Sequence, residues 1–136
     1  LCTHHYKDMN SIYLLYGRGL SLAEYCDIYF YLVNASPDAN ELADVAKRYQ
    51  LSEYIYYCIY YANELFDDER LLNYLDKLYS ERARELLNSY GLDDSERCEW
   101  EIPFYERLLD VGFIDRFALT LSDEQMRKVR INHEFM

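Results

Sequence analysis

Apolar residues recur along most of this chain at intervals of three and four positions, which is the period of a helix that buries one face. The pattern is rarely interrupted, because the 136 residues include only four glycines and two prolines. No stretch alternates apolar and polar residues well enough to predict a strand. The expected fold is therefore all-α, an irregular bundle of six to eight helices.

Residues with capping chemistry set several of the expected helix boundaries. Ser21 and Glu24 form a capping box, in which the Ser21 hydroxyl accepts from the amide three residues on and the Glu24 carboxylate reaches back. Ser52 and Ser122 are plausible caps for two later helices. Gly91 is expected to end a helix before a polar loop over residues 92–101. The first four expected helices span residues 1–16, 22–34, 38–49 and 53–66. The next carries Leu71 to Leu78 and continues from Ser80 to Tyr90, a further helix over 103–110 resumes over 113–119, and a last basic helix follows residue 122.

The distribution of apolar residues also predicts which side of each helix is buried. Residues 53–66 are apolar nearly all round, which is typical of a central helix. The chain has 16 tyrosines, and most are expected at helix interfaces with their hydroxyls at the rim. The expected inward residues are Leu22, Cys26, Tyr29, Phe30 and Val33 in helix 22–34, and Leu42, Val45, Ala46 and Tyr49 in helix 38–49.

Length, charge and hydropathy limit the class of protein. The length fits one domain, and the pattern of residues 1–16 begins without a helix start signal, so we expect a single helical domain cut from the C-terminal part of a longer protein. The formal net charge of −11 argues against DNA as a partner, because phosphate binding needs clustered Lys and Arg. The longest apolar stretch, residues 54–62, is far shorter than the roughly 20 residues that cross a bilayer, so no membrane partner is expected.

The four cysteines lie at positions 2, 26, 58 and 98. No CxxC pair and no Cys/His cluster at zinc spacing occurs, so the sequence predicts no metal site. Cys26 and Cys58 lie inside apolar helical runs, where a free thiol behaves as a small hydrophobic group. Reduced core thiols in a cytoplasmic protein are therefore expected.

Motifs with known catalytic chemistry are absent from the sequence. It contains no P-loop, no G-x-S-x-G and no H-E-x-x-H, so no catalytic residue and no cofactor is predicted for these residues. The pairs Asp67–Asp68 and Asp93–Asp94 lie in turn contexts, where Asp caps helices and closes Asx-turns.

Four polar residues in the first 27 positions are candidates for ligand binding. His4 and Lys7 share one face of the expected first helix, which is either a solvated surface or a surface that meets a phosphate or an acidic group. Arg18 lies between two glycines, which let the backbone pass close to a ligand. Asp27 lies in the otherwise apolar stretch 25–33 and is expected to be paired, hydrogen-bonded or neutral, with Arg18 as its natural partner. The pair is either a structural salt bridge or part of a ligand pocket.

Several segments together resemble a known family. The runs HHYK at 4–7, GRGL at 17–20 and LAEYCDIY at 22–29 resemble the helical C-terminal half of a bacterial family of uncharacterised nucleotidyltransferases. Residues 49–66 and 100–108 are similar to the rest of that half. The sequence departs from the family at Asp8, because a second histidine often follows the lysine there.

The resemblance implies an accessory role. An upstream domain of the same chain would supply the G-S and D-x-D residues that bind Mg²⁺ and a nucleoside triphosphate. The helical half would brace that site or close over it. The positions that match and would face the cleft are His4, Lys7, Arg18 and Asp27.

Two other functions are compatible with the residues. A stand-alone helical module could bind a protein partner through an acidic, tyrosine-rich surface, because Tyr buries a large area at a low entropic cost. The spacing of Arg127 and His133 is similar to the R-x4-6-H signature of HEPN ribonucleases, although Lys128 stands where that family commonly has Asn, Asp or His.

Overall fold

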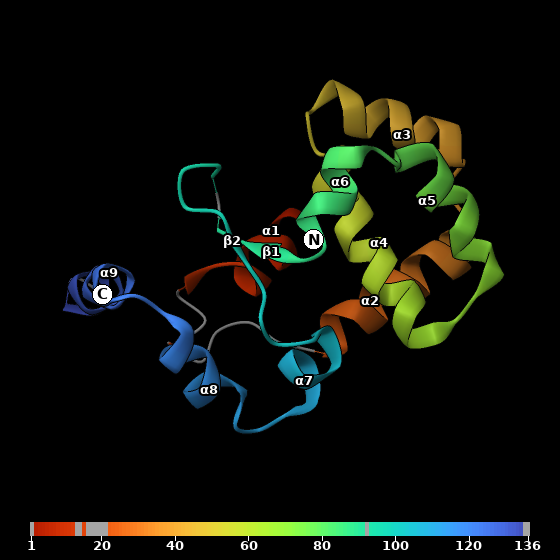
Figure 1. Ribbon diagram of the computed structural model, residues 1–136. Coiled ribbons are helices and arrows are strands. Elements are labelled where there is room, and N and C mark those ends of the chain that lie inside the picture. The colour runs from red at the N-terminus through yellow and green to blue at the C-terminus, as the bar shows by residue number, and fades with distance from the viewer. Residues whose placement is uncertain (1, 13–14, 16–21, 92, 135–136) are drawn as a thin grey trace. The chain divides into compact units, whose positions relative to one another are not determined.

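The structure is a computed structural model that describes residues 2–12, 15, 22–91 and 93–134 (Figure 1). In this part of the chain the fold is all-α, as predicted, with nine α-helices where six to eight were expected, and a two-stranded sheet that was not expected. No helix among the described residues is both long enough and apolar enough to cross a bilayer. The elements are α1 (Cys2–Met9), α2 (Leu22–Ala35), α3 (Ala39–Arg48), α4 (Ser52–Phe66), the 3-10 helix η2 (Glu69–Leu71), α5 (Leu72–Leu78), α6 (Glu81–Leu86), β1 (Ser89–Tyr90), β2 (Cys98–Glu99), α7 (Phe104–Leu109), α8 (Phe113–Thr120) and α9 (Asp123–Glu134).

The chain divides into two compact units. The first unit consists of Leu1–Tyr6 and Ser21–Asn88, and the second unit consists of Lys7–Leu20 and Ser89–Met136. The second unit is therefore built from two segments that are distant in the sequence. Each unit has its own buried residues and is described separately below.

Helix α4 is the centre of the first unit, as its all-round apolar character predicted. It contacts α2, α3, α5 and α6 (Figure 1). Tyr57, Cys58 and Ala62 are completely buried. The Tyr57 ring lies edge-on to Tyr6, with 5.0 Å between the ring centroids. Tyrosine rings thus form much of this core, as expected from their abundance.

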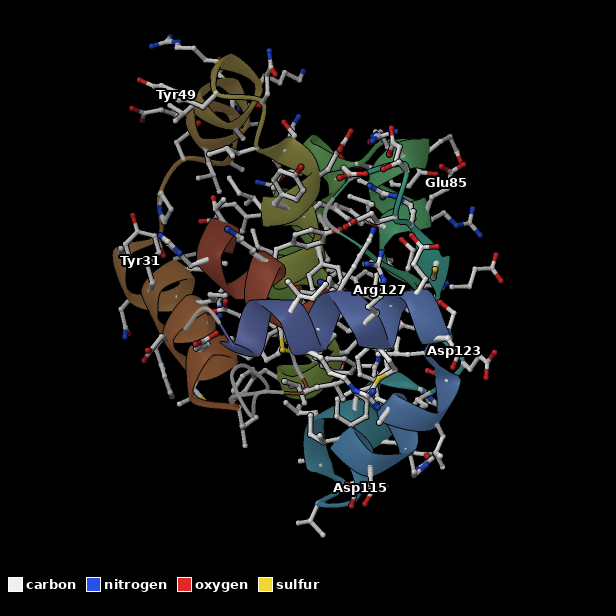
Figure 2. The ribbon with its side chains drawn as sticks, turned by 90° about the vertical axis from the view of Figure 1, so that its left-hand side faces the viewer. Tyr31, Tyr49, Glu85, Asp115, Asp123 and Arg127 are labelled. Carbon is white, nitrogen blue, oxygen red and sulfur yellow. The ribbon has the colours of Figure 1, made fainter. Side chains whose placement is uncertain are left out.

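The buried faces of α2 and α3 differ from the prediction. Helix α2 buries Tyr25, Ile28 and Leu32, whereas Leu22 is 46% and Phe30 is 53% exposed. Because nearly every side of α2 carries apolar residues, the helical period alone does not select one face. Helix α3 buries its three alanines and exposes Val45 and Tyr49, because small side chains let helices approach closely. Figure 2 shows Tyr31 on α2 and Tyr49 at the end of α3.

Side-chain caps account for several helix starts. The Asp38 carboxylate accepts from the Glu41 amide at 2.9 Å and begins α3. The Ser80 hydroxyl accepts from the amide three residues on and begins α6. Ser52 is not a cap as expected, because it is already the first residue of α4. The proposed cap Ser21 lies outside the described residues, although α2 has nearly its expected span.

The segment that follows α6 forms a hairpin where the sequence predicted a helix to residue 90. Ser89 pairs with Glu99 and Tyr90 with Cys98 in the antiparallel sheet. A continuing helix would join the Leu87 carbonyl to the amide of residue 91. The Leu87 carbonyl instead accepts from the Tyr61 hydroxyl at 2.6 Å, and the Gly91 amide donates to the Asn10 carbonyl at 2.7 Å. Tertiary hydrogen bonds therefore replace the helical ones.

An aromatic core holds the second unit together. Phe113 and Phe117 stack with 5.7 Å between their ring centroids, and Trp100 lies 5.0 Å from Phe117. The buried Arg107 places its guanidinium 4.5 Å from the centre of the Trp100 ring, a cation–π contact. Helix α1 ends at Met9, well before the predicted residue 16, and the following Asn10 is buried with its side-chain oxygen accepting from Trp100 Nε1 at 3.2 Å.

We expect Gly91→Ala to lower the free energy of unfolding of the second unit by about 3 kcal/mol, because a left-handed backbone and a steric clash are both unfavourable there. Gly91 has a φ of +109°, and a Cβ would lie 2.5 Å from the Glu96 carbonyl oxygen. Urea unfolding followed by the fluorescence of Trp100, the single tryptophan, measures the loss.

The matched control for this variant is Gly112→Ala. The nearest atom to a Cβ at Gly112 is a side-chain oxygen of Asp110 at 3.3 Å, which can move. The expected loss is about 1 kcal/mol or less. Equal losses for the two variants would contradict the strain assigned to Gly91.

Candidate functional site

The second unit contains two adjoining cavities, which we call the groove. Their volumes are about 440 and 210 Å³. They share Cys98, Ser122 and Gln125 in their linings. One wall of the groove is the segment 95–101, which includes β2, and the other wall is the segment 120–128, which joins α8 to α9.

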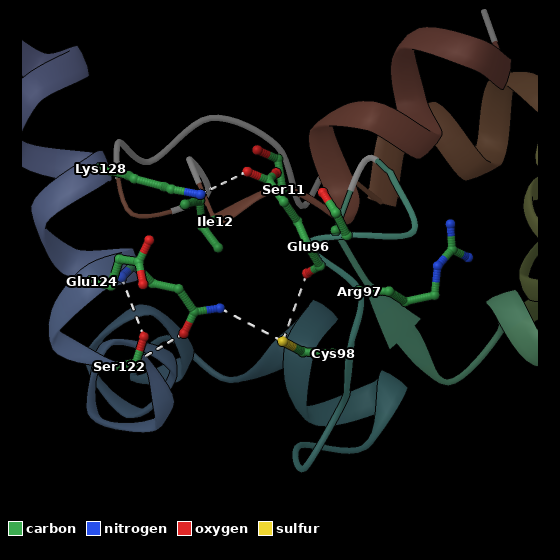
Figure 3. A pocket seen from close by; sticks show the side chains of 11 residues that line it. Ser11, Ile12, Glu96, Arg97, Cys98, Ser122, Glu124 and Lys128 are labelled. Atoms are coloured by element: carbon green, nitrogen blue, oxygen red, sulfur yellow. Dashed lines mark hydrogen bonds and ion pairs between the residues drawn. The ribbon is translucent and has the colours of Figure 1, made fainter.

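A capping box and a sulfur contact position the two walls. The Ser122 hydroxyl accepts from the Gln125 amide at 3.2 Å, and the Gln125 side-chain oxygen accepts from the Ser122 amide at 2.9 Å. Ser122 is therefore the cap that the sequence predicted. The Gln125 side-chain amide donates to Cys98 Sγ at 3.7 Å and so bridges the groove, while the Cys98 thiol donates to the Glu96 carbonyl (Figure 3).

Carboxylates outnumber cations in the groove. Lys128 forms an ion pair with Glu96 at 3.0 Å (Figure 3). Arg97 points away from Lys128 and pairs with Asp94 at 3.1 Å. Among the described residues, no ion pair joins the three other glutamates of the lining to a cation. These three are Glu99, Glu101 and Glu124.

The larger cavity also has an aromatic wall. Tyr90 and Trp100 lie there with 4.6 Å between their ring centroids. Burial raises the pKa of the Tyr90 hydroxyl, and the neighbouring Cys98 adds to this rise, whereas a hydrogen bond with Gln125 opposes it. Tyr90 is therefore neutral at physiological pH, and its ring joins Trp100 as an uncharged surface beside the glutamates.

The three candidate residues that the structure describes, His4, Lys7 and Asp27, do not line the groove. His4 and Lys7 are exposed on α1, three positions apart as expected. Arg18 lies outside the described residues. Asp27 is exposed on α2, because the buried face of α2 runs through Tyr25. Its expected pairing with Arg18 stays a prediction. In the described part of the chain no hydrogen bond or ion pair links His4, Lys7 or Asp27 to one another.

The structure also describes parts of the ribonuclease signature and of the Asp93–Asp94 pair. Arg127 is exposed on α9 (Figure 2), and the side chain of His133 lies outside the described part, so the ribonuclease signature stays a prediction. Asp93 accepts from the Ser95 amide at 2.9 Å, which is the turn role expected of it. Among the described residues, no group of three or more His, Cys, Asp and Glu side chains could hold a metal ion.

The groove residues could not be selected from the sequence. Glu99, Trp100 and Glu101 lie at the end of the segment expected to be a polar loop, and only tertiary contacts bring them opposite α9. The spacing of Ser122 and Gln125 was the one available signal, because S-x-x-Q is a capping box.

A second polar cluster lies in the first unit. The Tyr29 hydroxyl donates to Asp68 Oδ2 at 2.7 Å, and Arg70 Nη2 lies 2.6 Å from the same oxygen. Asp68 also accepts from the Arg70 amide at 3.0 Å, which caps η2. The hydrogen bonds from Arg70 and Tyr29 hold the pKa of the Asp68 carboxyl well below its ordinary range. The cluster fastens the α4–η2 turn to α2 and has a structural role.

Comparison with known proteins gives no relative for the chain. No family model, no curated protein and no solved structure matches it. The geometry of the groove is therefore the basis for a functional proposal.

We expect Arg70→Met to raise the pKa of Asp68 toward its ordinary value, because the variant removes the bidentate cation. The folded-state pKa is depressed, so the cluster stabilises the first unit above the ordinary carboxyl pKa, and this contribution is lost as the pH falls through the folded pKa. An NMR titration of the Asp68 carboxyl carbon measures both forms. An unchanged midpoint in the variant would contradict the assignment.

Proposed function

We propose that this chain is a helical protein-interaction module whose groove binds a cationic side chain of a partner protein. The observation that carries the proposal is the position of Glu99 and Glu101 beside Trp100 in an open cavity of about 440 Å³. A carboxylate attracts a Lys or Arg side chain by charge, and an indole ring attracts it by its quadrupole. Carboxylates beside an aromatic ring favour a cation over an anion, because the carboxylates repel negative charge.

The charge of the whole chain supports a basic partner. A net charge of −11 produces a field that attracts cations over distances comparable with the Debye length, about 8 Å at physiological salt. The two cations in the groove lining already have acidic partners, so they oppose a cationic ligand only weakly. The size of the larger cavity lies within the range of ligand pockets, about 300–1,000 Å³.

Apolar surface next to the groove favours a protein over a small free cation. Leu119 is 88% exposed and directly precedes Thr120 and Leu121, which line the larger cavity. A free cation would gain nothing from that leucine, whereas the residues flanking a bound Lys or Arg would cover it. The module would then combine a charged centre with an apolar rim.

A lysine-rich peptide is expected to change the fluorescence of Trp100, and Glu99→Gln with Glu101→Gln is expected to weaken its binding about tenfold, which corresponds to about 1.4 kcal/mol. A glutamate-rich peptide of the same length is expected to cause no change. Binding is also expected to weaken with added salt, because the attraction is between charges near the surface.

The matched control is Asp44→Asn with Asp76→Asn, which changes the net charge equally but on α3 and α5 of the first unit. Less than about a twofold effect is expected, because neither residue lines the groove and salt screens charges outside it. If the two double variants weaken binding equally, the peptide senses only the total charge and the groove is not its site.

A nucleotidyltransferase accessory domain is the second candidate. The observation that favours it is the exposure of both His4 and Lys7 on one side of α1, since these are two of the positions that the resemblance assigns to a nucleotide cleft. In that case the upstream domain would hold Mg²⁺ and the triphosphate, and α1 would contact the phosphates.

Titration with Mg-ATP is expected under this second proposal to shift the amide NMR signals of His4 and Lys7, with weak binding because the upstream site is missing. Lys7→Ala is expected to weaken it severalfold, since a Lys–phosphate contact is lost. Lys77→Ala on α5 is the control and should leave it unchanged. Signals of His4 and Lys7 that do not respond to Mg-ATP would exclude this role for α1.

A further inference from the structure

Two cysteines of the first unit lie together although 56 positions separate them. Cys2 is the first residue of α1, and Cys58 lies in the middle of α4. The Cys58 thiol donates to the Cys2 carbonyl oxygen at 3.4 Å. Each thiol also shifts the pKa of the other, as expected for neighbouring groups. The side chains are therefore adjacent across the contact between α1 and α4.

The two thiols differ in exposure and in acidity. Cys58 is completely buried, whereas Cys2 is half-buried and in contact with solvent. The neighbouring Cys58 thiol lowers the pKa of Cys2, and the first turn of a helix favours a thiolate further. Burial raises the pKa of Cys58 well above its ordinary value. Cys2 is thus the thiol that ionises and that a reagent reaches first.

We propose that Cys2 and Cys58 are a redox-active pair that closes to a disulfide by exchange with a low-molecular-weight disulfide. The Cys2 thiolate attacks one sulfur of that reagent, forms a mixed disulfide and releases one small thiolate. Cys58 then loses its proton to solvent and attacks Cys2 Sγ. This step breaks the mixed disulfide, forms the Cys2–Cys58 bond and releases the second small thiolate.

The electrons balance in this sequence. The two protein thiols lose two electrons and two protons, and the small disulfide is reduced to two thiols. Cys58 is the resolving thiol because it is shielded from the reagent but adjacent to Cys2. Cys26 on α2 and Cys98 in the groove are also free thiols. Among the described residues, no contact places a second thiol beside either of them.

The bond would fasten the start of α1 to the central helix of the first unit. It closes a loop of more than 50 residues, and loops of that length restrict the unfolded chain strongly. Oxidation would therefore stabilise the first unit, and reduction would allow the first turn of α1 to separate from α4. The sequence predicted a core thiol at Cys58, which the burial confirms, but not its partner.

The test is oxidation of the 136-residue protein with glutathione disulfide, followed by alkylation of the remaining thiols and peptide mapping without reduction. The expected product is a peptide pair linked through Cys2 and Cys58, with Cys26 and Cys98 alkylated. The midpoint of thermal unfolding is expected to rise by roughly 10 °C. Before oxidation, iodoacetamide should label Cys2 roughly tenfold faster than Cys58 or more.

Three variants separate this proposal from simple surface oxidation. Cys2→Ser should abolish both the linked peptide and the rise in thermal stability, and Cys26→Ser should change neither. Cys58→Ser should leave Cys2 as the mixed disulfide with glutathione. If the wild-type protein stops at that mixed disulfide, or links Cys2 to another cysteine or to a second chain, the proposal is wrong. The conclusion from Cys2→Ser stands even where Cys58→Ser fails to fold.

Discussion

Asn10 makes two hydrogen bonds that join the separate segments of the second unit. Its carbonyl accepts from the Gly91 amide, and its side-chain oxygen accepts from the Trp100 indole. Asn10 is completely buried, so a lost partner would leave a polar group without water and would cost about 1–3 kcal/mol. The hairpin needs the first bond in order to leave the helical path after α6, and Trp100 needs the second in order to face Tyr90. The groove and its aromatic wall depend on both.

Local chemistry determined most of what the sequence predicted correctly. The helices α2, α3 and α4 lie within a few residues of their expected spans, because the residues that interrupt the helical pattern between them are neighbours in the sequence. The central position of α4 followed from its composition. Asp93 and Ser122 have the turn and cap roles expected of them, since each bond spans two or three residues.

The errors in the prediction share one physical origin, which is competition from distant groups. The helix expected over residues 80–90 ends at Leu86 because Tyr61 and Asn10 take the hydrogen-bonding groups that a longer helix would use. The inward face of α2 was wrong because apolar residues surround that helix and the packing partner selects the side. The groove was not predictable, because nothing in the sequence near Glu99 or Gln125 indicates that the hairpin lies opposite α9.

The division of the second unit in the sequence has a consequence for synthesis on the ribosome. Residues 21–88 of the first unit emerge as one block, and they can pack before the hairpin exists. The hydrogen bond between Asn10 and Trp100 can form only after Trp100 has been synthesised, 90 positions later. During that interval the segment after α1 has neither of its tertiary partners. The groove would therefore form after the first unit, and its assembly would be slow relative to the local helices of that unit.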